Sequence, residues 1–411
     1  MNQSCSARLS TSNQPAPTLP TTYPFDGVIQ HYAWGGYDYL PQLLDKPNPH
    51  QHPWAELWMG AHPKGPGQVR GQEHTLDEII AAAPHEVLGQ EVADRFDDRL
   101  PFLFKVLDVR EMLSIQVHPT KQAAEEGFAR EEENGPARDA PDRNYRDDNH
   151  KPELGVALTD FYLLHGFRSE AAIRDALQRV PGWQSLLPQL EQGGTKGLYA
   201  YVMHADQDEV DRLLQPLVDS LEGQAYPREE PAFWAQRAVE QYSHEGHHDR
   251  GMFSIYWFNL VHLRPGEGIF QDAGIPHAYL EGVCIELMAN SDNVLRGGLT
   301  PKHIDVPELL DKTRFAPVTP AILRPRAQQS GWQTYPTPAP DFKLSRMEPA
   351  AGTEFTLAAG GSAAIALLLR GGVAGESLQL EEVTRTVFLP AGTEVRLTAL
   401  QDSSLYLATV G

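Results

Sequence analysis

The chain has 411 residues and a formal net charge of -21, which argues against nucleic acid or an anionic membrane as its partner. The length indicates two or three domains, and the composition, 41% hydrophobic and 22% charged, is that of a globular protein. Its two cysteines, Cys5 and Cys284, lie far apart, so we expect no disulfide framework and a reducing, cytoplasmic location. No apolar run approaches the roughly 20 residues that span a bilayer.

The first 23 residues are rich in Ser, Thr, Pro, Asn and Gln. They lack the apolar core of a signal peptide, so we expect a disordered extension.

The next clear element is a short helix over residues 75–83, because Thr75 to Glu78 form a capping-box pattern and Pro84 follows. Residues 102–106 read as a buried strand that contains Lys105, a costly position unless the ammonium finds an anion or reaches water.

A second strand is predicted over residues 113–118, directly before Pro119. Side chains alternate between the two faces of a strand, so Ser114, Gln116 and His118 share one face and the intervening apolar residues face the core. The polar row either faces solvent or lines a site.

After a charged connector over residues 121–150, an alternating strand is predicted over residues 155–164. Helical spacing then dominates until about residue 251, with Asp206 predicted to cap one of the helices. Residues 243–249 contain three histidines but read as a polar loop. A strand is predicted again over residues 255–263. From about residue 319 the sequence predicts short strands separated by Gly and Pro turns.

The region around residues 265–277 combines Pro-Gly-x-Gly with Ile-Pro-His, a pattern of the double-stranded β-helix or jelly-roll proteins called cupins. In that fold a strand after the turn carries a metal-binding histidine, here His277. The usual partner motif is His-x-His followed by a glutamate. In this chain Gln116 takes the place of the first histidine, His118 is the second, and Glu153 is the best carboxylate. Histidine and glutamate suit a zinc-like divalent ion.

Several longer motifs resemble the type I mannose-6-phosphate isomerase family. The resemblance covers roughly residues 24 to 315, and it includes the helical segment by position rather than by motif. The matching segments are Tyr32 to Gly35, Ala55 to Pro63, Leu113 to Pro119, Asn149 to Leu154, Pro276 to Leu280, Met288 to Arg296 and Gly298 to Lys302.

The resemblance implies reversible aldose–ketose isomerisation of mannose 6-phosphate and fructose 6-phosphate through an enediolate, with one Zn²⁺ per chain. It places the zinc ligands on Gln116, His118, Glu153 and His277. It assigns Arg296 to catalysis. Substrate and phosphate binding falls on Ser114, Lys105 and Lys302. Ring opening and proton transfer fall on His150, Lys151, Glu286 and Asp292. The general base stays open between Lys151 with His150 and Glu286.

The fold we expect is mainly β with a helical insertion. A cupin catalytic domain would comprise residues 24–166 and 252–318, interrupted by a helical domain over residues 167–251. Residues 319–411 would form a C-terminal cupin-like β domain, with no metal expected because no histidine follows its turn at residues 389–393. The expected partner is a small sugar phosphate, with neither nucleic acid nor membrane, and the chain would be a monomer or a weak homo-oligomer.

Two alternatives remain at this stage. A non-catalytic sugar-binding or regulatory cupin would keep the fold without turnover, although binding alone needs no Lewis acid. A metal-dependent cupin dioxygenase would generally use iron and a histidine-rich ligand set, which Gln116 disfavours. The identity of the bound metal separates these alternatives: zinc favours the isomerase, iron the oxygenase, and no metal the binding protein.

Overall fold

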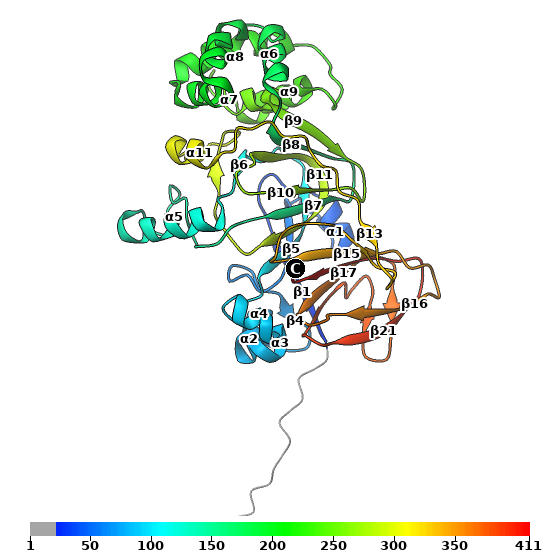
Figure 1. Ribbon diagram of the computed structural model, residues 1–411. Helices are drawn as coiled ribbons and strands as arrows, with labels where there is room; N and C mark the ends of the chain where they lie inside the picture. Colours follow the sequence, from blue (N-terminus) through cyan, green and yellow to red (C-terminus); the bar gives the residue numbers. More distant parts are fainter. Residues whose placement is uncertain (1–21) are drawn as a thin grey trace, which may run out of the picture.

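The computed structural model describes residues 22–411 and shows three regions along the molecule (Figure 1). The helices of the predicted insertion gather at one end, the strands of the predicted catalytic domain occupy the middle, and the C-terminal strands lie at the other end (Figure 1). The extension predicted over residues 1–23 lies outside the described residues except for its last two. Among the described helices, none combines the length and the apolarity needed to cross a bilayer.

The middle region is a branched, ten-stranded antiparallel sheet centred on its longest strand, β11. The first residues of β11 pair with β6 and β8, and the remainder pairs with β5 and β7. One strand therefore connects the two arms of the sheet. The strands are β2 (Val28–Gln30), β3 (Glu56–Met59), β5 (Phe102–Val109), β6 (Gln116–Val117), β7 (Glu153–Ala157), β8 (Phe161–Phe167), β9 (Phe258–Leu263), β10 (Gly268–Gln271), β11 (His277–Ala289) and β12 (Leu295–Arg296).

The helical insertion has a common apolar core with the adjoining arm of the sheet, including Trp183, Trp234 and Trp257. Asp206 caps α8 as predicted, because its side chain accepts a hydrogen bond from the Glu209 amide. The helices here are α6 (Glu170–Arg179), the 3₁₀ helix η1 (Trp183–Leu186), α7 (Leu187–His204), α8 (Gln207–Leu221), α9 (Pro231–Tyr242), α10 (Met252–Trp257) and α11 (Val306–Lys312).

Two local predictions need correction. The strand predicted over 255–263 starts only at Phe258, because α10 occupies the preceding apolar residues; a short apolar run does not distinguish buried helix from buried strand. The strand predicted over 155–164 is two strands, β7 and β8. The charged connector begins with a 14-residue helix, α5 (Lys121–Asn134), capped by Thr120.

The predicted capping box at Thr75 is present at the start of α2 (Leu76–Ala82). Pro84 ends that helix but also begins α3 (Pro84–Leu88), since a proline is tolerated at the first helical position. Two further helices of the N-terminal half are α1 (Tyr39–Leu43) and α4 (Gln90–Arg95).

The C-terminal region packs an eight-stranded sheet against a four-stranded one. The larger sheet includes two N-terminal strands, because β1 lies between β20 and β4, with Phe25 opposite Thr386 and Val69. The predicted division put residues 24 onward in the catalytic domain, whereas these strands complete the C-terminal sheet. The strands are β1 (Tyr23–Asp26), β4 (Gln68–Val69), β13 (Arg326–Ala327), β14 (Gln333–Thr334), β15 (Lys343–Met347), β16 (Glu354–Ala358), β17 (Ala364–Arg370), β18 (Val373–Ala374), β19 (Gln379–Leu380), β20 (Thr386–Leu389), β21 (Glu394–Ala399) and β22 (Ser404–Thr409).

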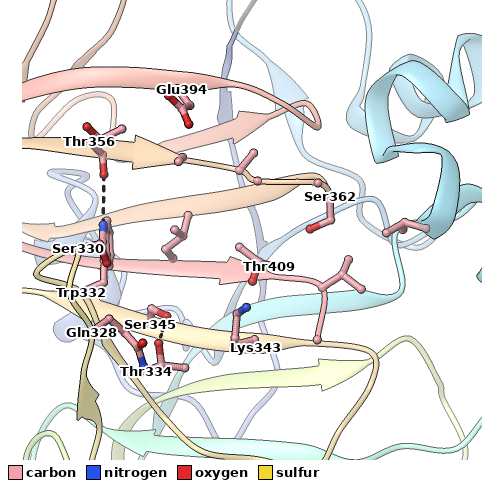
Figure 2. A pocket seen from close by; sticks show the side chains of 18 of the residues that line it. Gln328, Ser330, Trp332, Thr334, Lys343, Ser345, Thr356, Ser362, Glu394 and Thr409 are labelled. Atoms are coloured by element: carbon pink, nitrogen blue, oxygen red, sulfur yellow. Dashed lines mark hydrogen bonds between the residues drawn. The ribbon is translucent and has the colours of Figure 1, made fainter.

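A cavity of about 840 Å³ opens between these two sheets and is here called the C-terminal cavity (Figure 2). Hydroxyl side chains line it from both sides, with Thr334, Ser345 and Thr409 on the larger sheet and Thr356 on the smaller. Thr334 and Ser345 hydrogen-bond to each other across neighbouring strands at 2.8 Å. The cavity wall thus combines these hydroxyl groups with solvent-exposed charged side chains such as Lys343 and Glu394.

Candidate metal centre and active site

Three buried side chains from three separate elements converge at the middle of the molecule. His118 follows β6, Glu153 begins β7 and His277 begins β11. One ligand atom from each lies within 4.8 Å of the others. The Nε2 atoms of His118 and His277 lie 3.3 Å from Glu153 Oε1 and Oε2, respectively. The structure thus brings together three of the four predicted metal ligands.

The hydrogen bonds of the two imidazoles define which nitrogen faces the cluster. His118 Nδ1 donates to the Asn293 carbonyl at 2.9 Å, and His277 Nδ1 donates to the Ile275 carbonyl at 3.0 Å. Because a carbonyl only accepts, the proton of each neutral ring sits on Nδ1 and the lone pair on Nε2 faces the cluster. Burial lowers the pKa of His118 to about 4, which favours its neutral form.

These lone pairs explain why a divalent cation fits. His118 Nε2 is buried and has no hydrogen-bond partner among the described residues. It faces a carboxylate that is itself an acceptor. The pKa of Glu153 lies well below its ordinary value in spite of burial, and the ammonium of Lys151 is the largest cause of the lowering. Acceptors that converge without a proton between them are stabilised by a cation, and backbone bonds at the far nitrogens are the usual way to orient histidine ligands. The residues therefore fit a zinc-like ion.

Gln116 lies beside this cluster on β6. It pairs in register with His277 on one side and with Arg296 on the other. Its side chain lines a cleft next to the cluster, together with Glu56, Lys105, Leu107, Leu113, Lys151, Glu153, His277, Ala278, Tyr279 and Glu286. Gln116 as fourth ligand stays a prediction that this position supports.

The cleft contains a buried ion-pair network built across β3, β5 and β11. Lys105 lies opposite Glu286 in the register of β5 and β11, and its Nζ is 2.9 Å from Glu286 Oε2. A second carboxylate oxygen, Glu56 Oε2, lies at 3.5 Å. Although burial alone would lower the pKa of Lys105, these carboxylates raise it. Burial raises the pKa of Glu286, against the lowering effect of Lys105.

This network changes the interpretation of Lys105. The sequence predicted it to hold the substrate or its phosphate, and the structure does place it in the cleft. Its charge is already balanced by Glu286 and Glu56, however, so it is poorly placed to neutralise a phosphate. Trp58 completes the enclosure, with its ring centroid 5.4 Å from Lys105 Nζ.

The residues predicted for ring opening and proton transfer occupy different positions. Lys151 reaches the cleft, with Nζ 3.1 Å from Glu153 Oε1 and a side chain that is 11% exposed. His150, its neighbour, instead bonds Asp341 of the C-terminal region at 2.9 Å. Asp292 pairs with Lys64 at 2.6 Å on the partly exposed side of the site. Of these three residues, only Lys151 lines the cleft.

A group of three cations lies at the other side of β6 and is here called the basic cluster: Arg146, Arg296 and Lys302. Burial and Arg146 lower the pKa of Arg296, and burial, Arg296 and Arg146 lower the pKa of Lys302. Within residues 22–411, none of the three forms an ion pair with a carboxylate. Like charges brought together without acidic partners are the arrangement that binds an anion.

The residue after Ser114 contacts the loop that connects Arg296 with Lys302. The Ile115 amide donates to the Gly298 carbonyl at 3.0 Å, in the loop between Arg296 and Lys302. Sequence reasoning missed Arg146, because it lies in an Asp- and Arg-rich connector where a single cation gives no signal.

Comparisons with known proteins agree with this geometry. A family model described as the type I phosphomannose isomerase catalytic domain matches residues 23–170. The mannose-6-phosphate isomerase of Salmonella typhimurium is 43% identical over 326 residues, which cover 77% of this chain and 81% of that protein. The human mannose-6-phosphate isomerase is 36% identical over 385 residues, covering 86% of this chain and 88% of the relative.

Solved structures agree as well. The crystal structure of the Salmonella typhimurium enzyme bound to its substrate, fructose 6-phosphate, and to zinc superposes with a TM-score of 0.86 at 37% identity, covering 95% of this chain and 99% of that one. A second structure, bound with zinc and yttrium, gives a TM-score of 0.85 at the same coverage. The match spans the catalytic, helical and C-terminal regions together, and the chain belongs to the type I mannose-6-phosphate isomerase family.

Proposed function

We propose that the chain interconverts mannose 6-phosphate and fructose 6-phosphate at a single zinc ion held by His118, Glu153, His277 and Gln116. The observation that carries the proposal is the convergence of two imidazole lone pairs and a carboxylate beside a cleft with buried acid and base groups. A family member of known structure carries zinc and fructose 6-phosphate, which supports the assignment.

The basic cluster is the proposed phosphate site. A substrate phosphate is a dianion, and Arg146, Arg296 and Lys302 can balance it in an otherwise acidic protein. Because Arg296 pairs with Gln116 on β6, the cluster and the proposed zinc ligands lie on neighbouring strands. A phosphate bound there directs the sugar carbon chain toward the cleft.

The chemistry requires that a proton leave C2 and return at C1. Lys151 is the side chain we propose for this transfer, since it lines the cleft next to Glu153. Glu286 is the second group that can hold a proton, and burial raises its pKa toward the neutral form. His150 supports Lys151 indirectly by fixing the loop through Asp341.

Bound zinc supplies a Lewis acid that stabilises the negative charge developing on O1 and O2 of the sugar. The protein adds to this stabilisation with the guanidinium of Arg296. The Lys105 network excludes water from one wall of the cleft and keeps Glu286 oriented. Asp292 stays a proposed participant at the partly exposed edge.

The test is isomerase activity on mannose 6-phosphate before and after chelation, with zinc added back. We expect activity to vanish on chelation and to return with zinc. The Gln116→Ala variant should lose most of its activity and bind zinc more weakly, whereas Gln379→Ala, an exposed glutamine of β19, serves as the matched control. A zinc-loaded protein that binds sugar phosphate without turnover would instead support the sugar-binding alternative.

We also propose that the chain acts in the cytoplasm, as a monomer or a weak homo-oligomer, without nucleic acid. The net charge of -21 and the single buried cysteine of the described residues, Cys284, support this environment. Light scattering at several protein concentrations tests the oligomeric state. A molar mass equal to that of a tetramer, unchanged on dilution, would contradict the proposal.

A further inference from the structure

The loop between Arg296 and Lys302 has an unusual backbone. Gly298 has φ +118° and Leu299 has φ +52°, although Leu299 carries a bulky side chain that is 1% exposed. A left-handed conformation at a buried leucine persists only where surrounding groups enforce it, and such positions concentrate at ligand sites.

Asp249, from the segment between α9 and α10, holds this loop. Its Oδ1 accepts hydrogen bonds from the amides of Leu299 and Gly251, both at 2.6 Å, and its Oδ2 accepts from the Thr300 amide at 3.1 Å. A carboxylate with three backbone donors is a strong, directional clamp. Asp249 therefore fixes the loop at its most strained residue.

The clamp continues to Lys302 through one further contact. The Lys302 amide donates to Thr300 Oγ1 at 3.1 Å. Asp249 fixes the Thr300 backbone, and the Thr300 side chain fixes the Lys302 backbone. The other half of the loop is held separately, because Gly297 and Gly298 bond Ile115 and Arg296 pairs with Gln116. Asp249 thus acts on the Lys302 end of the basic cluster.

We propose that Asp249 is a positioning residue for phosphate binding: it fixes the loop from the helical insertion so that Lys302 completes the basic cluster. The proposal rests on the proposed function, in which that cluster binds the substrate phosphate. It gives the helical insertion a role in substrate affinity, since the segment that ends the insertion carries the clamp. Asp249 touches neither the reacting carbons nor the proposed zinc ligands.

The test compares Asp249→Asn with Asp206→Asn, a helix-cap aspartate of the same insertion that does not contact the loop. The amide side chain keeps one acceptor and the size of the carboxylate, so this is the milder change. Asp249→Ala is the second variant. The measurements are kcat and KM for mannose 6-phosphate, the inhibition constant of inorganic phosphate, and the rise in melting temperature that inorganic phosphate produces.

We expect Asp249→Asn to raise both KM and the phosphate inhibition constant about tenfold, with kcat within about threefold of the parent. The stabilisation by phosphate should shrink in parallel, and Asp206→Asn should leave all three unchanged. An unchanged KM in a folded Asp249→Asn protein overturns the proposal. So does a loss of kcat and melting temperature with no change in phosphate affinity, because that pattern marks a merely structural role.

The phosphate measurements need no turnover. If the parent protein is stabilised by phosphate and Asp249→Asn is not, the positioning role stands even where isomerase activity is absent. If the parent protein is active but neither variant alters phosphate affinity, the proposed function stands and the role of Asp249 falls.

Discussion

The catalytic cleft and the C-terminal cavity are both openings between β-strands, yet they differ in what they enclose. The C-terminal cavity is large, about 840 Å³, and Ser, Thr and Gly make up much of its wall (Figure 2). The catalytic cleft is small, but it places Lys105, Lys151, Glu153 and Glu286 beside His277. Volume alone would have selected the wrong opening.

The two openings differ in the charged and polar groups that they enclose. In the cleft, buried charges face one another and two imidazole lone pairs face a carboxylate, so the site is complete only with a cation. In the C-terminal cavity, Thr334 and Ser345 hydrogen-bond to each other, and the charged side chains Lys343 and Glu394 are exposed to solvent. Only the cleft therefore encloses buried charges that a bound cation would complete.

The largest expected effect is from removing a zinc ligand. His118→Ala should lower kcat by about 1,000-fold or more, since the proposed Lewis acid provides several kcal/mol of charge stabilisation. Steady-state kinetics and the zinc content of the purified variant check this together. A variant that keeps full zinc and activity would remove the contrast between the two openings.

The next effect is on stability. Lys105→Met leaves Glu286 and Glu56 buried without their cation, so the free energy of unfolding should fall by about 3 kcal/mol. Lys343→Met, in the C-terminal cavity, is the matched control and should change it by less than about 0.5 kcal/mol, because Lys343 is exposed. Urea unfolding measures both, and equal losses would show that the two lysines are equivalent.

A smaller effect is expected at the basic cluster. Arg146→Ala should raise KM for mannose 6-phosphate about tenfold with little change in kcat, because it removes a charge that binds substrate and transition state alike. Arg138→Ala serves as the control, since Arg138 pairs with Glu132 on the surface. Initial rates at low ionic strength give the comparison, and an unaltered KM for Arg146→Ala would exclude it from the phosphate site.

The smallest effect is expected in the C-terminal cavity itself. Ser345→Ala removes one hydrogen bond, to Thr334, and should lower the free energy of unfolding by about 1 kcal/mol or less. Activity should stay at the parental level. A marked loss of turnover would mean that the C-terminal cavity communicates with the cleft, and the contrast between the two regions would need revision.

Much of the site was predictable because its chemistry is local in sequence. Alternation over residues 113–118 predicted that Gln116 and His118 share one face, and the turn pattern before His277 predicted a third ligand. In the structure the strand is only Gln116 and Val117; Gln116 pairs with His277, and His118 joins His277 in the cluster. Capping patterns at Thr75 and Asp206 predicted helix starts that the structure confirms. Such features depend on neighbouring residues, which a sequence displays directly.

The features of the site and fold that the sequence did not predict depend on contacts between residues far apart in the chain. Arg146 joins the basic cluster, Asp249 clamps a loop about fifty positions later, and His150 bonds Asp341, and none of these pairs follows a local pattern. The ordering of β1 beside β20 is of the same kind. The choice of partner between distant segments is set by tertiary packing, which composition and periodicity do not encode.

The pairing of β1 with β20 also constrains how the chain is made. A ribosome adds about 5–20 residues per second, so β1 emerges long before its partner strand exists. Until Thr386 is synthesised, the edge of β1 that will face it stays open to other chains. Among the described residues, the first strand thus pairs with one of the last. We therefore expect the nascent N-terminal region to need rapid completion of the chain or chaperones, and a chain that ends before β20 to aggregate.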